Sequence, residues 1–576
     1  MKKAALALIF AGCACWAAPA HKKISKDLDD VDALSNVKII IQWKSNPDTK
    51  TQRILNRGGV LHAVHRSIKA GTYTVPASIL HDLENDPDVV YITPDRPVSF
   101  KLDYTAAAIN ASYAWNSGYN GAGIGVAVLD SGINPSDPNL GQGPSNSGSR
   151  VVYTQDFVGG NGQDQYGHGH HIAGIIGSNG YSTSAANCSS CSRQLIGIAP
   201  GSTILNFRVL DQNGQASDSI VISAIEQAIA LQSTHNIRVI NLSLGRPVYE
   251  SYTLDPLCQA VEAAWKAGIV VVVAAGNDGR DDTYGEQGYG TITVPGNDPY
   301  VITVGGMKTM GTDTRIDDLI ASYSSKGPTQ IDHIVKPDVV APGNGVVSLL
   351  ASSSVTLARE FPSNTVTRAY YQDTSPGIAS KTSKNFFTLN GTSMATGVVS
   401  GAVADILQAN PKLTPDQVKA LIMQTAYKTF PVSSTATDPV SGLSYVDYYD
   451  IFTVGAGYLD LEAALQSINN VPAGTALSPV ANYTSSSGTV TLSYGSTDIW
   501  STRAVWGAQS VWGNSVVTGN RAVWGAQAVW GASNPSSSQS VWGAQAVWGA
   551  QSIWGANNSS GSSTSSALSV AIRGEQ

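Results

Sequence analysis

Residues 125–132 read Gly-Val-Ala-Val-Leu-Asp-Ser-Gly, an apolar run that ends on an acidic residue and a turn. Unbroken apolar runs bounded by polar turns are typical of strands that are buried on both faces of a sheet. Similar runs recur at residues 204–210, 239–242, 269–273 and 301–304, with helical patterns between them at residues 220–231 and 257–265. The alternation predicts an α/β fold: a doubly wound, mostly parallel sheet flanked by helices, with ligands at the carboxyl ends of the strands.

Four polar residues stand at these predicted strand ends or helix starts, namely Asp130, His168, Asn277 and Ser393. Taken singly, each has an ordinary structural explanation as a turn residue or a helix cap. Taken together, they supply what acyl transfer to a serine requires. The hydroxyl attacks, the imidazole takes its proton, the carboxylate fixes the tautomer of the imidazole, and the amide donates to the oxyanion.

Longer segments around these residues resemble a known family. Three of them are similar to the signature motifs of the subtilisin-like (subtilase) serine proteases: Asp130-Ser131-Gly132, His168-Gly169-His170-His171-Ile172-Ala173-Gly174 and Gly391-Thr392-Ser393-Met394-Ala395. Supporting segments lie at residues 197–200, 241–245, 336–343 and 455–460, so the resemblance covers about residues 104–467. The order Asp, His, Ser is that of subtilisin. A lipase or esterase on another α/β scaffold is disfavoured by this order and by the absence of G-x-S-x-G around Ser393.

The resemblance implies a role for each residue. Ser393 would be the nucleophile, His168 the general base and acid, and Asp130 the orienting carboxylate. Asn277 and the backbone N–H of Ser393 would form the oxyanion hole. The implied substrate-binding residues, whose small side chains would leave room for a large apolar substrate residue, are Ser243, Leu244, Gly245, Ala275 and Gly276. The implied chemistry requires no cofactor.

The chain departs from the family pattern at several points. His170 stands where the family usually has Thr, and we expect a second imidazole there to lower the pKa of His168 by like-charge repulsion. Gly397 stands where the family usually has Pro, which loosens the start of the following helix. The three neighbouring histidines lack zinc-site spacing, so no metal site is predicted. Residues 178–193 are unlike the calcium loop of many subtilases, which leaves a structural calcium ion possible but unsupported.

The segment before the protease-like region divides in two. Residues 1–20 have the pattern of a signal peptide: a basic start, an apolar stretch and an A-x-A site. A lipoprotein-type box ending at Cys13 is the alternative, in which the chain would be lipid-anchored. Residues 21–103 are predicted to form a small α+β unit with strands at 37–43 and 89–93 and helices at 46–56 and 78–85. This unit resembles the family's inhibitory propeptide, which implies self-cleavage within about residues 97–106.

Three cysteines lie beyond the predicted signal peptide. Cys188 and Cys191 are three positions apart in a loop rich in Ser and Asn, which favours a local disulfide over a redox pair. Cys258 lies on an apolar helical pattern, so we expect it to be a buried free thiol.

The composition changes after about residue 469. In residues 470–576 charged residues are scarce, and eight of the twelve tryptophans recur in one six-residue register from Trp500 to Trp554. This hexapeptide repeat, approximately Ala-Val-Trp-Gly-Ala-Gln, is incompatible with a regular helix. Three interpretations remain open: a stacked β-solenoid or hairpin array, an exposed aromatic strip that binds a partner, or a disordered tail. We expect an accessory element whose removal after about residue 470 leaves peptide hydrolysis nearly unchanged.

Two functions from different classes follow. The first is an exported serine endopeptidase with protein or peptide substrates, its own propeptide as inhibitor, and a secreted, extracellular or periplasmic location. The second is an inactive or regulated scaffold that attaches to polysaccharide, a cell surface or further copies through the Trp repeat. A net charge of −7 without a basic block argues against nucleic acid as a partner.

Overall fold

The structure is a computed structural model. The predicted signal peptide, Cys13 and most of the Trp repeat lie outside the residues that it describes. Those residues are 23–25, 28, 31, 35–94, 101–102, 104–142, 148–281, 287–372, 380–438, 442–471, 473–484, 489–495, 497–499, 516–517, 522–524, 528–530 and 572–575.

The chain divides into two compact units, Met1–Ser99 and Phe100–Gln576. In the first unit an antiparallel sheet with the order β2-β3-β1-β4 packs against two short helices around a core of its own. Its elements are β1 (Asn36–Trp43), α1 (Thr51–Leu55), β2 (Val60–His65), β3 (Ala70–Pro76), α2 (Leu80–Glu84) and β4 (Val89–Pro94). The strands predicted at 37–43 and 89–93 are present, the predicted helices are shorter than expected, and β2 and β3 were not predicted.

An eight-stranded sheet forms the centre of the second unit. The order is β13-β12-β11-β10-β6-β9-β7, with β14 paired to β12, and every pair is parallel except β12 with β13. The doubly wound, mostly parallel sheet predicted from the apolar runs is therefore confirmed. Its strands are β6 (Gly125–Asp130), β7 (Val151–Asp156), β9 (Thr203–Arg208), β10 (Ile237–Leu242), β11 (Val270–Ala274), β12 (Ile302–Lys308), β13 (Leu319–Ile320) and β14 (Val339–Asn344).

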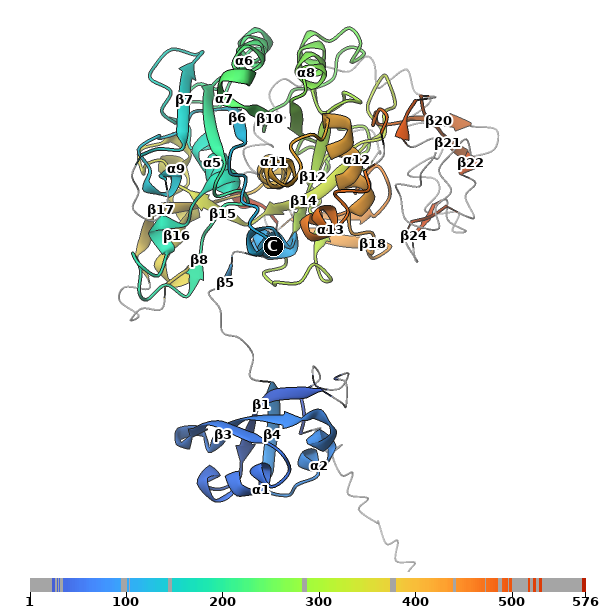
Figure 1. The fold of residues 1–576 in the computed structure, drawn as a ribbon. Coiled ribbons are helices and arrows are strands. Elements are labelled where there is room, and N and C mark those ends of the chain that lie inside the picture. The colour runs from blue at the N-terminus through green and yellow to red at the C-terminus, as the bar shows by residue number, and fades with distance from the viewer. Residues whose placement is uncertain are drawn as a thin grey trace, which may run out of the picture. The chain divides into compact units, whose positions relative to one another are not determined.

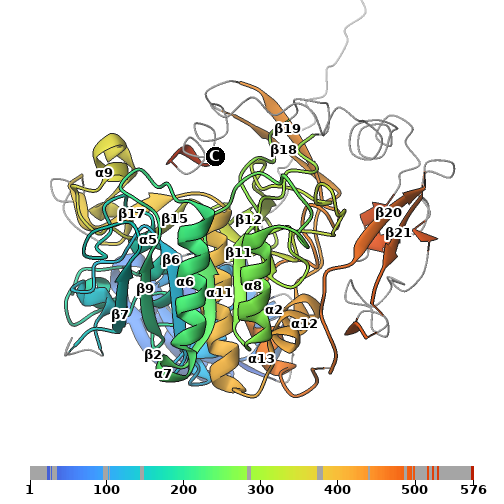
Figure 2. The same cartoon turned by 90° about the horizontal axis from the view of Figure 1, so that it is seen from above.

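Helices cover both faces of this sheet (Figure 1). α6 and α8 lie on one face, and α5, α11, α12 and α13 lie on the other. Figure 2 shows α6 and α8 running side by side. The helices are α5 (Gly169–Gly177), α6 (Asp218–Ala230), α8 (Pro256–Lys266), α11 (Thr392–Ala409), α12 (Pro415–Thr425) and α13 (Leu461–Gln466).

Smaller elements surround this framework. A three-stranded sheet with the order β15-β17-β16 and two two-stranded pairs, β5-β8 and β18-β19, join it. Short helices precede β6 and follow α6 and β15. These elements are β5 (Lys101–Leu102), α3 (Tyr104–Ala108), α4 (Ala111–Asn116), β8 (Arg193–Gln194), α7 (Gln232–His235), β15 (Val346–Leu349), α9 (Thr356–Glu360), β16 (Thr365–Thr367), β17 (Thr382–Leu389), β18 (Ser433–Thr437) and β19 (Ser444–Tyr448).

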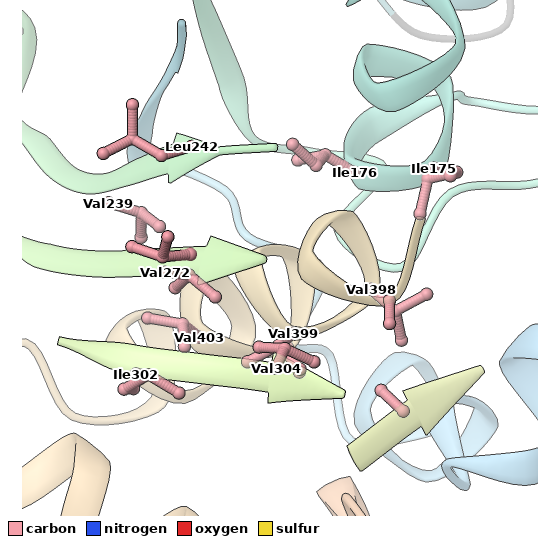
Figure 3. Close-up of a cluster of buried hydrophobic side chains, with 14 of the residues drawn as sticks. Ile175, Ile176, Val239, Leu242, Val272, Ile302, Val304, Val398, Val399 and Val403 are labelled. Atoms are coloured by element: carbon pink, nitrogen blue, oxygen red, sulfur yellow. The ribbon is translucent and has the colours of Figure 1, made fainter. Parts of the chain in front are cut away.

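The core lies where α11 crosses the sheet. The helix is rich in Ala, Val and Gly, and nearly all of its residues are buried. Figure 3 shows Val399 and Val403 of α11 next to Val272 and Val304 of the neighbouring strands. At the start of the helix a Cβ added to Gly397 would lie 3.2 Å from a side-chain carbon of Ile175. α5 and α11 therefore pack closely against each other.

The packed unit continues beyond the composition change at residue 470. Buried side chains of this region, Ala476, Ala481, Val490, Leu492 and Ile499, belong to the same hydrophobic core as the central sheet. β20 (Val480–Thr484) and β21 (Thr489–Ser493) form an antiparallel pair, and β22 (Val516–Val517) adds to β21. The first part of the predicted extension is thus built into the protease unit.

Within the Trp repeat, two short strands are described. β23 (Ala522–Trp524) and β24 (Ala528–Trp530) pair antiparallel, so two successive six-residue units form one hairpin. A hairpin is one of the three forms expected for the repeat. Among the described residues, no helix is both long enough and apolar enough to cross a membrane.

Candidate active site

Asp130 and His168 form a buried pair at one end of the sheet. Asp130 is the last residue of β6, and His168 immediately precedes α5. His168 Nδ1 lies 2.7 Å from Asp130 Oδ1, and both side chains are nearly excluded from solvent. With Nδ1–H held by the carboxylate, the imidazole is the tautomer whose Nε2 can accept a proton.

A second carboxylate holds the backbone around this pair. The Ser131 hydroxyl donates to Asp164 Oδ1 at 2.9 Å and accepts from the Gly169 N–H at 2.8 Å. Asp164 also accepts from the backbone N–H groups of Gly167 and His170. Asp164 therefore ties the turn after β6 to the start of α5. Sequence reasoning missed it, although it lies four positions before His168.

The surroundings of His168 raise its pKa above 6.5. Burial lowers the pKa, but the charge of Asp130, its hydrogen bond and the charge of Asp164 together raise it by more. This overturns the expected lowering by His170. The His170 ring lies 3.0 Å from Asp137 Oδ2, so its nearest charged neighbour is a carboxylate. The third histidine, His171, donates to the Phe387 carbonyl, and burial lowers its pKa to about 3.

Ser393 lies in the first turn of α11, whose cap is Gly391. The Ser393 hydroxyl donates to the Ser243 carbonyl at 3.1 Å, and the Ser243 hydroxyl donates to the Ser393 carbonyl at 2.9 Å. No hydrogen bond joins Ser393 to His168 within the described residues. Such bonds are often loose before substrate binds.

Asn277 stands beside the start of α11. Its Oδ1 accepts from the Thr392 N–H at 2.9 Å and from the Thr392 hydroxyl at 3.2 Å, which leaves the Nδ2 donor for another partner. Gly391 has a φ of 137°, and a Cβ there would lie 3.3 Å from Asn277 Nδ2. Any larger residue would crowd this amide, so the glycine keeps the space before the nucleophile open.

Two chain segments form walls near Ser393. Ser243, Leu244 and Gly245 follow β10, and the N–H and C=O groups of Leu244 and Gly245 form no backbone hydrogen bond within the described part of the chain. The second wall consists of Ala275 and Gly276, which follow β11. The Ala275 carbonyl accepts from the Thr293 N–H at 3.1 Å.

Thr293 stands between these walls. A Cβ added to Gly245 or to Gly276 would lie 2.5 or 2.9 Å from Thr293 side-chain atoms. Nothing in the sequence around Thr293 indicated this position.

The remaining predictions on this unit concern cysteines and calcium. Cys188 and Cys191 form a disulfide and Cys258 is a buried free thiol, as expected. Residues 178–193 contain no Asp or Glu, and carboxylates are common calcium ligands, so calcium in this loop stays without support. Among the described residues, no group of three or more His, Cys, Asp and Glu side chains could hold a metal ion.

Comparison with known proteins agrees with this geometry. Residues 121–449 match the model of the Subtilase family. The chain is 35% identical over 358 residues to serine protease AprX of Bacillus subtilis, covering 60% of this chain and 72% of that protein. It is 30% identical over 380 residues to subtilisin E of Bacillus subtilis, covering 66% and 80%. It is 32% identical over 368 residues to an extracellular serine proteinase of a Thermus species, covering 61% and 69%.

The chain therefore belongs to the subtilase family, and it is a serine endopeptidase.

Proposed function

We propose that this protein is an exported endopeptidase that hydrolyses protein or peptide substrates through an acyl-enzyme on Ser393. The observation that carries the proposal is the buried pair of Asp130 and His168 at the start of α5, together with Ser393 in the first turn of α11. Those two helices pack against each other, and His168 and Ser393 stand at their N-terminal ends.

The reaction then runs in two stages. Ser393 Oγ attacks the substrate carbonyl while His168 Nε2 takes its proton, and Asp130 stabilises the resulting imidazolium. The developing oxyanion meets Asn277 Nδ2 and the N–H of Ser393, which has no partner within its own helix because it lies in the first turn. His168 then gives the proton to the leaving amine. In the second stage water attacks the acyl-enzyme, with His168 again taking and then returning a proton, and the acid product leaves Ser393 free.

The substrate backbone pairs with the Ser243–Gly245 wall. The open backbone groups of Leu244 and Gly245 support this pairing, because an extended peptide can add to them as a strand. The side chain before the scissile bond lies beside Gly245, Gly276 and Thr293, and we propose a large apolar residue there. Profiling a peptide library with the mature enzyme tests this preference.

We propose that the enzyme is secreted, extracellular or periplasmic, and that residues 21–103 form its inhibitory propeptide. The support is a separately folded unit directly before the protease unit. Self-cleavage falls within about residues 97–106. No cofactor takes part, and the Trp repeat serves attachment to polysaccharide, cell surfaces or further copies.

A fluorophosphonate probe tests the catalytic assignment directly. The wild-type protein should be labelled on Ser393, and Ser393→Ala should not be labelled. His168→Ala should be labelled far more slowly, because the hydroxyl loses its base. An unlabelled wild-type protein that is folded would support the alternative, an inactive or regulated scaffold.

A further inference from the structure

Residues Ile572–Glu575 lie against the protease unit, although the Trp repeat separates them from the rest of it in the sequence. Ile572 belongs to the main hydrophobic core, and its carbonyl accepts from Asn364 Nδ2 at 2.6 Å. The Glu575 side chain is fully buried. A buried carboxylate needs positive or hydrogen-bonding partners, so these residues indicate a formed binding site.

The site matches an acidic side chain. Glu575 Oε2 accepts from the Ser322 N–H at 2.7 Å, and Oε1 lies 3.4 Å from Lys308 Nζ. Arg280 adds a second positive charge at 3.9 Å. Asn344 holds the backbone on both sides: it accepts from the Glu575 N–H at 2.8 Å and donates to the Glu575 carbonyl at 2.7 Å.

The residue before Glu575 must be glycine. Gly574 has a φ of 58°, and a Cβ there would lie 2.1 Å from Asn390 Oδ1 and 2.8 Å from Asn344 Oδ1. Both facts exclude other residues at this position. The site thus selects a Gly-Glu pair rather than any acidic residue.

The order of the strands places this site relative to the cleft. Ser243 follows β10, Asn277 follows β11, and Lys308 and Asn344 end β12 and β14. Because β11 lies between β10 and β12, the Glu575 site and Ser243 lie on opposite sides of Asn277. In Figure 2 the last described residues lie near β17 and the β18–β19 hairpin. Asn390, which Gly574 approaches, directly precedes the Gly391 turn.

We propose that Arg280, Lys308, Ser322 and Asn344 form a binding site for the Ile572–Glu575 segment of the same chain, and that the bound segment covers the leaving-group side of the cleft. The inference rests on the proposed function, in which the acyl part of the substrate pairs with Ser243–Gly245. A long substrate must then pass Asn277 toward β12 and β14, where the segment already lies. The segment slows cleavage of long peptides and leaves short substrates unaffected.

Two substrates with the same acyl part test this. One is a p-nitroanilide, which has no residue beyond the scissile bond, and the other is a quenched fluorescent peptide with four residues beyond it. The mature enzyme is compared with a variant that ends after residue 571 and with Glu575→Lys, each checked by intact mass. Arg573→Ala is the matched control, because Arg573 belongs to the same segment and its side chain is exposed.

We expect kcat/KM for the long peptide to rise about tenfold in the truncated and Glu575→Lys variants, the factor that one lost charge-assisted hydrogen bond corresponds to. The p-nitroanilide should be hydrolysed at the parent rate by all variants, and Arg573→Ala should behave like the parent. The synthetic peptide Ala-Ile-Arg-Gly-Glu-Gln should inhibit cleavage of the long peptide by the truncated enzyme, and a version with Lys in place of Glu should not.

Two results would overturn the proposal. One is equal cleavage of the long peptide by all variants with the p-nitroanilide activity intact. The other is a parallel change on both substrates, which assigns the segment to stability alone. A parent enzyme that hydrolyses neither substrate would instead refute the proposed function, so the two failures are distinguishable.

Discussion

Ser478 should contribute measurably to stability, although it lies beyond the change in composition at residue 470. Its hydroxyl donates to Asp338 Oδ1 at 2.5 Å and accepts from Lys419 Nζ at 2.8 Å. Asp338, Lys419 and Lys336 are completely buried, and Asp338 pairs with both lysines. The hydroxyl therefore completes a charged cluster in the core, and Ser478→Ala removes it with little change in volume.

The expected loss follows from the partners that stay. A hydrogen bond to a charged group contributes about 1.5–3 kcal/mol. Lys419 still donates to the carbonyls of Pro299 and Val301, and Asp338 still accepts from Lys336 and the Thr303 N–H. Because both charged groups keep other partners, we expect Ser478→Ala to lower the free energy of unfolding by about 2 kcal/mol, which is less than the summed energy of two such hydrogen bonds.

Guanidinium unfolding, carried out in a Ser393→Ala background to prevent autolysis, measures this difference. Ser493→Ala is the matched control: Ser493 also lies after residue 470, is exposed at the end of β21 and accepts a single side-chain bond from Asn482. The control should change the unfolding free energy by less than about 0.5 kcal/mol. If Ser478→Ala and Ser493→Ala unfold at the same guanidinium concentration, the cluster does not depend on the extension and our reasoning fails.

Four further outcomes are expected. Because the base must be neutral and the pKa of His168 is raised, kcat/KM should fall with decreasing pH through a midpoint above 6.5. Asp164→Asn should lower that midpoint, because it removes a negative charge near His168. A pH profile that Asp164→Asn does not shift would contradict this argument. Asn277→Ala should reduce kcat by about 10²–10³ with little change in KM, measured on a p-nitroanilide. Ser393→Ala, expressed alone in a protease-free system, should accumulate uncut, whereas the wild type should show a new N-terminus within about residues 97–106. Because buried residues after 470 belong to the core, we replace the composition-based expectation of unchanged hydrolysis: truncation after residue 470 should lower the unfolding temperature and the yield of active enzyme.

Patterns of neighbouring residues correctly predicted the strands and helices whose apolar residues are continuous or regularly spaced. The apolar run before Asp130 became β6, and the pattern at 257–265 became α8. β2 was missed because His62 and His65 interrupt its apolar residues, and tertiary pairing with β3 overrides that weak pattern.

The site residues that were missed act through distant partners. Thr293 stands between two walls that belong to other strands, and Asp164 acts on a turn more than thirty positions earlier through Ser131. The pKa of His168 was expected to fall because a second imidazole, His170, lies only two positions away in the sequence. The carboxylates that instead raise this pKa are Asp130, at the end of β6, and Asp164, in the loop before α5.

The region after residue 470 shows why composition alone misplaced the limit of the folded unit. Two of its described polar residues satisfy buried charges of the protease unit. Ser478 completes the cluster of Asp338 and Lys419, and Glu575 lies between Lys308 and Arg280. Lys308 is itself almost fully buried, so its ammonium would lose a carboxylate partner if Glu575 were absent. The scarcity of charged residues after residue 470 is therefore a change in composition and not the end of the folded unit. Residues on both sides of the repeat, Ser478 and Glu575, contact buried charges of the core.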